Sequence, residues 1–111
     1  MPDNSTELLK GTLDLLILRT LALEPMHGLG ISDRIRQITG GVFVVKPGSL
    51  FPALHRLEEK GWLDSRWGET EANRKAKFYR ITESGKKQLE QEKQNWLRVL
   101  TAVNQVIEQE S

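Results

Sequence analysis

The chain has 111 residues, the size of one domain, and 38% of them are hydrophobic, which suffices for a modest core. Its formal net charge is +1 and it has no cysteine, so any basic surface must be local, and disulfide frameworks, thiolate zinc sites and cysteine nucleophiles are excluded. The N-terminal stretch lacks the order of a signal peptide, and the longest apolar run, interrupted by Arg19, is too short to cross a bilayer. We therefore expect a cytoplasmic protein with no membrane partner.

Residues 5–23 have the periodicity of a helix, with Ser5 or Thr6 as the expected N-cap. Two apolar stripes follow its length, one of Leu9, Leu13, Leu16 and Thr20 and one of Leu8, Thr12 and Leu15. Such a helix is apolar over most of its circumference and predicts two packing surfaces. We favour contact of one surface with another chain; the alternative is that both pack within the chain.

Residues 28–38 predict a second helix after the break at EPMHG, and the glycines at 40 and 41 are expected to end it. The side chains expected to face the core are Ile31, Ile35 and Ile38. VFVV at 42–45 is β-prone but brief, which predicts a short strand or an extended bridge.

The stretch KPGSLFPALHRLEEKGWL, residues 46–63, predicts a third helix that begins abruptly. Ser49 is the favoured N-cap, because Pro52 then stands among the first helical positions, whose N–H groups have no partner within a helix. A start at Pro47, with Pro52 costing one interior hydrogen bond, remains the alternative. The inward face and the stop signal are Leu50, Leu54 and Leu57, then Lys60 and Gly61.

The beginning of this third helix predicts a DNA contact. A helix start with free N–H groups suits phosphate binding and insertion into a major groove, and the preceding helix makes the pair a helix-turn-helix. The residues expected on its outward side are Ser49, Phe51, Pro52, His55 and Arg56. Arg56 is expected to bridge two acceptors of guanine; the alternative is a surface residue paired near Glu59.

Residues 63–81 predict a hairpin, because two β-prone runs flank the polar turn GETEANR. Its second arm carries a basic strip of Arg74, Lys75, Lys77 and Arg80. Taken alone, such a strip is more often a solvated hairpin than a binding site. Directly after a helix shaped for the groove, it is expected to act as a wing that contacts the DNA backbone.

Residues 83–110 predict a long final helix with a coiled-coil seam. The seam consists of Leu89, Trp96 and Val103, interleaved with Lys93, Leu100 and Ile107. Together with the two stripes of the first helix, it exceeds what one small domain covers, so we expect a homodimer; the alternative is packing on the chain's own first helix. Trp96 is expected to be core, with a stacked ligand as the alternative.

Three stretches carry a family resemblance: HGLGISDRI, KPGSLFPALHRLEEKGWLDSRWGE and RKAKFYRITESGKKQL. In this order they are similar to the PadR family of winged-helix transcriptional regulators, over nearly the whole chain from about Leu8. The most specific parts are PGSLFPALHRLEEKG and KFYRITESG.

The resemblance implies a mainly α (α+β) fold, a winged helix-turn-helix over residues 1–81 with a C-terminal dimerisation helix over 82–111. It also implies a repressor that binds palindromic double-stranded operator DNA as a homodimer, with no catalytic residues, no cofactor and, in some members, a small-molecule effector near the dimer interface. The residues it assigns to the DNA-facing helix are Ser49, Phe51, Pro52 and Arg56, and those it assigns to the wing are Arg74, Lys75 and Lys77. The expected dimer contacts are Leu9, Leu89, Trp96, Leu100, Val103 and Ile107.

Two positions depart from the family pattern. Phe51 stands where tyrosine is usual, which removes a phenolic contact, and Lys46 stands where a small polar residue is usual. Lys46 is unable to cap a helix but long enough to reach a phosphate. The way in which the operator is read is therefore expected to differ.

Two other classes of function were weighed. An enzyme would need a constellation of catalytic groups, yet His27 and His55 have no partner at metal-ligand or triad spacing, so we expect neither a metal nor catalysis. A winged helix that binds proteins is the second alternative. Such a module has no need of the basic strip.

Overall fold

The computed structural model describes the backbone of residues 4–109 and the side chains of residues 12–109. Within that part, four helices and a three-stranded antiparallel sheet of order β1-β3-β2 form an α+β fold, as expected. The elements are α1 (Asn4–Leu21), β1 (Met26–His27), α2 (Gly28–Ile38), α3 (Pro47–Glu59), β2 (Leu63–Glu69), β3 (Lys75–Ile81) and α4 (Glu83–Ile107). None of these helices is long and apolar enough to cross a membrane.

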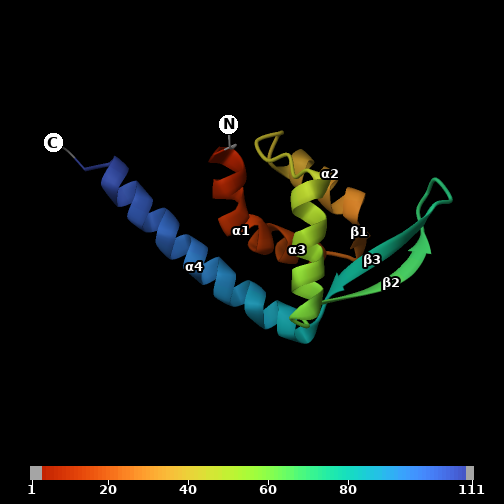
Figure 1. Cartoon of the computed structure of the whole chain (residues 1–111). Helices are drawn as coiled ribbons and strands as arrows, with labels where there is room; N and C mark the ends of the chain where they lie inside the picture. The colour runs from red at the N-terminus through yellow and green to blue at the C-terminus, as the bar shows by residue number, and fades with distance from the viewer. Residues whose placement is uncertain (1–3, 110–111) are drawn as a thin grey trace.

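The core lies where α1, α2 and α3 meet the base of the hairpin. The fully buried large side chains are Ile17, Leu18, Ile31, Leu50, Leu54, Leu57 and Leu63. In Figure 1 the hairpin extends from this core to one side and α4 to the other, both starting near the C-terminal end of α3. The core therefore holds the wing and α3 in a fixed relation.

The sequence-based expectations for α1 and α2 are partly wrong. The helix of α1 already includes Asn4, so Ser5 and Thr6 are helical, and the N-cap lies outside the described residues. Ile31 and Ile35 are buried as expected, but Ile38 is 64% exposed. Ile38 is the last residue of α2, and the left-handed glycines 40 and 41 turn the chain away before anything covers it.

The third strand is not the one that the sequence suggested. Met26 and His27, within the stretch expected only to break a helix, pair with Tyr79 and Phe78 of β3. The run VFVV forms no strand and does not join the sheet, whose order is β1-β3-β2. It is the extended bridge instead, fixed where the Ser32 hydroxyl donates to the carbonyl of Val45 at 3.2 Å.

Helix α3 begins at Pro47, so the favoured N-cap at Ser49 is wrong and the alternative start is right. Lys46 is the N-cap residue, and its carbonyl accepts from the N–H groups of Ser49 and Leu50 at 3.0 and 2.9 Å. Its side chain makes no capping bond. Pro47 suits the first helical position because its φ is already helical, and Pro52 stands inside the helix.

The C-terminal end of α3 leads tightly into the hairpin. Gly61 has a φ of +78°, and the N–H of Trp62 donates to the carbonyl of Leu57 at 3.1 Å, the pattern of a Schellman motif. In the hairpin, Leu63 pairs with Ile81 and Glu69 with Lys75. This confirms the hairpin around a polar turn.

Helix α4 starts against the same corner. The Thr82 hydroxyl accepts from the N–H of Gly85 at 3.0 Å, and the N–H of Thr82 donates to the carbonyl of Trp62. A Cβ on Gly85 would lie 2.1 Å from that carbonyl oxygen, so only glycine allows the approach. The first turns of α4 are thereby locked to the core, and Leu89 is buried with it.

Candidate nucleic-acid interface

One face of α3 is exposed along its whole length. Residues that recur every three or four positions form it: Gly48, Phe51, Pro52, His55 and Glu59, with Lys46 exposed just before the helix. The ring of Phe51 is 44% exposed and lies against Gly28 at the start of α2, where a Cβ would stand 2.7 Å from the ring. This face therefore presents a rigid apolar edge, a basic residue and the positive end of a helix dipole.

The other candidates on α3 take different positions. Ser49 is half-buried at the first turn. His55 is exposed and its Nε2 lies 2.9 Å from the Glu59 carboxylate one turn along. The carboxylate holds the imidazole on the exposed face, beside the residues expected to meet DNA.

Arg56 faces another way. Its guanidinium donates to the carboxylate of Asp14 in α1, and both side chains are partly buried. The expectation of a free, outward Arg56 therefore differs from the structure, and so does the alternative of a partner near Glu59. The available signal was Ala53, which is buried one turn before Arg56 and marks that side of the helix as a packing side.

Glu58 connects α3 to the wing. The hydroxyl of Ser65 in β2 donates to its carboxylate at 2.5 Å, and Nζ of Lys77 in β3 lies 3.8 Å from it. Burial, and then the charge of Glu58, raises the pKa of the nearby Tyr79 phenol. Lys77 is thus a link between wing and helix as well as a candidate DNA contact.

The basic strip is divided between two roles. Arg80 forms a two-pronged ion pair with Asp64 across the hairpin, at 2.7 and 3.0 Å. The hydrogen bond from Arg80 lowers the pKa of the Asp64 carboxyl, and the same bond raises the pKa of Arg80. Arg74 and Lys75 are exposed near the tip and form no ion pair with any described side chain.

The distal half of α4 carries an apolar stripe, which we define as Trp96, Val99, Leu100, Val103, Val106 and Ile107. All are exposed, and Trp96, the most covered of them, is still 39% exposed. Leu89, expected in the same seam, belongs instead to the core of its own chain. The side chain of Leu9 lies outside the described residues.

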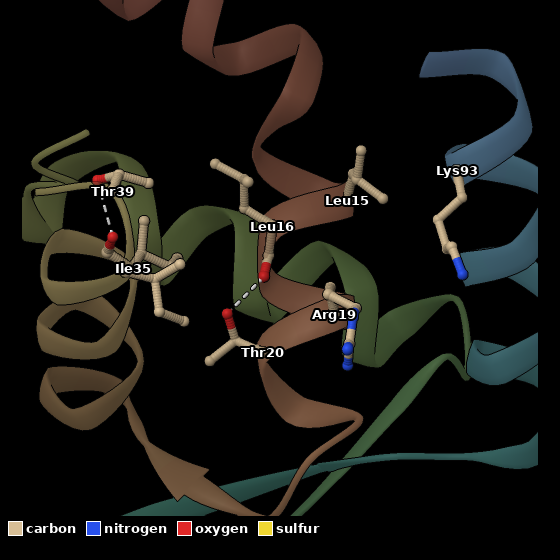
Figure 2. Close-up of a pocket in the computed structure, with 8 residues that line it drawn as sticks. Leu15, Leu16, Arg19, Thr20, Ile35, Thr39 and Lys93 are labelled. Atoms are coloured by element: carbon tan, nitrogen blue, oxygen red, sulfur yellow. Dashed lines mark hydrogen bonds between the residues drawn. The ribbon is translucent and has the colours of Figure 1, made fainter. Parts of the chain in front are cut away.

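A hollow of about 300 Å³ lies beside α1 and α2. Its lining is Leu15, Leu16, Arg19, Thr20, Ile35, Ile38, Thr39 and Lys93. Figure 2 shows Leu15 on the side of α1 that faces α4, with the amine of Lys93 across the gap, and Trp96 is not part of the lining. The hollow is an apolar recess with two cations, separate from the exposed face of α3.

The described part of the chain offers no cluster of three or more metal-ligating side chains of the His, Cys, Asp and Glu types. On α3, His55 and Glu59 pair with each other, whereas Arg56 pairs with Asp14 of α1. The geometry is that of a binding surface made of a helix face and a wing.

Comparisons with known proteins agree with this geometry. A family model, described as the transcriptional regulator PadR-like family, matches residues 17–91. A protein of Lysinibacillus sphaericus, described only as uncharacterized, is 30% identical over 103 residues, which is 93% of this chain and 94% of its own.

Solved structures give the same result. A transcriptional regulator from Clostridium thermocellum is 31% identical with a TM-score of 0.81, over 89% of this chain and 96% of its own. A PadR-like transcriptional regulator from Bacillus cereus is 31% identical with a TM-score of 0.79, over 94% of this chain and 99% of its own. A PadR family transcription regulator from Clostridium difficile is 28% identical with a TM-score of 0.74, over 86% of this chain and 98% of its own.

Proposed function

The chain belongs to the PadR-like family of transcriptional regulators, and we propose that it represses transcription by binding a palindromic operator as a homodimer. Regulators of this family bind DNA and are not enzymes. One observation supports the finer proposal: Glu58 ties α3 to the hairpin, because its carboxylate accepts from the Ser65 hydroxyl and forms an ion pair with Lys77.

In the proposed complex, the N-terminal turns of α3 enter the major groove. Lys46 contacts a phosphate beside the start of α3, where the helix dipole favours an anion. The exposed edge of Phe51 suits apolar contact with a thymine methyl group, and His55 and Ser49 lie within the same footprint. Arg74 and Lys75 contact the backbone from the wing.

We propose the apolar stripe of α4 as the dimer contact, with residues 1–81 as the DNA-binding unit and 82–111 as the dimerisation unit. An exposed apolar surface of this extent, ordered along one helix face, is typical of a protein interface. Pairing through α4 places two copies of α3 in a two-fold arrangement. A palindromic operator follows from that symmetry.

A small-molecule effector is part of the same proposal. Trp96 offers a large aromatic surface within the stripe, so an aromatic ligand stacked on it would alter how the two copies of α4 meet. The hollow beside α1 and α2 is a second candidate place. The competing idea, a winged helix that binds only proteins, gives no role to the unpaired Arg74 and Lys75.

The proposal is tested with the DNA upstream of the protein's own gene. We expect a retarded complex in gel shifts that survives excess random duplex, with two chains per duplex by light scattering. A variant with Lys46 and Phe51 replaced by alanine should lose the operator complex but remain folded, since both side chains are exposed. Equal binding to operator and random duplex would contradict sequence-specific regulation.

A further inference from the structure

The wing carries an exposed tryptophan that the basic strip does not explain. Trp67 of β2 is 69% exposed, and its cross-strand neighbour is Lys77. A hollow of about 580 Å³ lies beside it, lined by Trp67, Gly68, Glu69 and Lys75. A large indole left in water on a two-stranded ribbon is costly unless it has a partner.

The alternation of a strand decides which way Trp67 faces. Successive side chains point to opposite sides, so Ser65, Trp67 and Glu69 share one face of the hairpin with Lys75 and Lys77 across from them. Ser65 and Lys77 both reach Glu58 of α3, so this is the face turned toward α3. Trp67 lies one step farther out, where α3 no longer covers the sheet.

We propose that Trp67 is a DNA-contacting residue, packing its indole against the sugar–phosphate backbone of the operator between α3 and the wing tip. This rests on the proposed function and adds an apolar contact to it. Lys77 directly across on β3 and Lys75 nearer the tip suit phosphates. The indole offers an apolar surface to a deoxyribose and one N–H donor to a phosphate oxygen. The surface is continuous with the exposed face of α3 through Glu58.

A duplex fits this face better than a protein segment because of its charge. On this face Lys77 is paired with Glu58 of α3, whereas Lys75 forms no ion pair with any described side chain. Glu69 is the carboxylate directly across from Lys75. A phosphate close to Trp67 would be repelled by Glu69. Replacing that carboxylate by an amide should therefore tighten DNA binding. If Trp67 contacted a protein segment instead, the same replacement should leave the affinity for DNA unchanged.

The first experiment observes Trp67 in the unaltered protein. Labelling with 5-fluorotryptophan gives one resonance each for Trp62, Trp67 and Trp96, and Trp67→Phe assigns the one of interest. We expect the Trp67 resonance to shift on saturation with operator duplex and to stay constant when the protein alone is diluted. A Trp67 resonance that ignores DNA, or that moves with protein concentration, overturns the inference.

The second experiment separates an apolar contact from an ionic one. Trp67→Ala should weaken operator binding roughly tenfold without changing the slope of log affinity against log salt. Lys75→Ala should lower the magnitude of that slope by about 0.9, and Glu69→Gln should strengthen binding. Leu23→Ala, which shortens an exposed apolar side chain between α1 and β1, is the matched control and should change neither quantity.

The outcomes distinguish a failure of the Trp67 contact from a failure of the proposed function. If wild-type protein binds the duplex but Trp67→Ala binds equally well, the role of Trp67 is overturned and the proposed function stands. If wild-type protein binds no DNA, both are overturned. A thermal melt of Trp67→Ala that matches wild type shows that any lost affinity comes from the missing contact and not from a disordered wing.

Discussion

The winged-helix body, residues 12–81, and the distal half of α4 use similar apolar residues in opposite ways. In the body, Leu50, Leu54 and Leu57 are fully buried, and no buried polar side-chain atom among the described residues lacks a hydrogen-bond partner. In distal α4 the whole apolar stripe faces solvent. The leucines of α3 are buried within one chain, whereas burial of the stripe requires a second molecule.

The residues that stabilise the fold are therefore different from those proposed to form the dimer. The core and its caps hold α3 and the wing in place without α4 beyond Leu89. Dissociating the proposed dimer should therefore leave a folded monomer with an exposed helix face.

Trp96→Asp should separate the two regions most strongly. A carboxylate within an apolar interface loses hydration without gaining a partner, which should weaken dimerisation by about 3 kcal/mol or more. We expect a folded monomer in sedimentation velocity, with a near-wild-type helical signal in circular dichroism. Gln94→Asp adds the same charge to an exposed position outside the stripe and should remain dimeric. A stable, fully dimeric Trp96→Asp protein would remove Trp96 from the interface.

Replacing Arg74, Lys75 and Lys77 together by alanine tests the wing of the body. Binding to every duplex should weaken, and the salt slope should lose about 0.9 for each phosphate contact removed. Because Lys77 also binds Glu58, the double variant of Arg74 and Lys75 isolates the purely electrostatic part. An unchanged slope in isothermal titration at several salt concentrations would mean that the strip is only solvated.

Arg56→Ala tests a contact that holds the body together. Loss of the charged hydrogen bond to Asp14 should lower the free energy of unfolding by about 1–2 kcal/mol, because Asp14 is left without its partner. Operator and random duplex should then lose affinity alike, through a less rigid α3. A double-mutant cycle with Asp14→Asn measures the pair directly. Full stability with a loss confined to the operator would restore Arg56 as a reader of bases.

Arg56 also shows what the sequence was able to predict. The leucine spacing of α3 predicted its inward face, and Lys60–Gly61 its end, because both depend on residues a few positions apart. The partner of Arg56 lies 42 residues away, so no local pattern contains it. The two-residue β1 was missed for the same reason, since it is a strand only through its pairing with β3.

The start of α3 was predicted wrongly for a different reason. Ser49 is a better N-cap than Lys46 by residue type, but Pro47 has a fixed φ that starts the helix two positions earlier. The exposed positions Lys46, Phe51, Pro52 and His55 were nevertheless identified from the sequence. Their role in reading the operator remains a prediction.

The smallest effect concerns an exposed ion pair of the body, that of Asp64 and Arg80 on the hairpin. Arg80 lowers the pKa of Asp64 below its ordinary value of 3.8, so the folded state holds the carboxylate ionised more readily than the unfolded chain does. Its contribution to stability is therefore present above that ordinary value and is lost as the pH falls through the lowered pKa. Because both groups are exposed, the gain should be small, and Asp64→Asn should melt only slightly below wild type at neutral pH. The two melting temperatures should converge as the pH falls below the lowered pKa of Asp64. A constant difference at every pH, measured by circular dichroism, would mean that the asparagine acts through the shape of the hairpin and not through the lost charge.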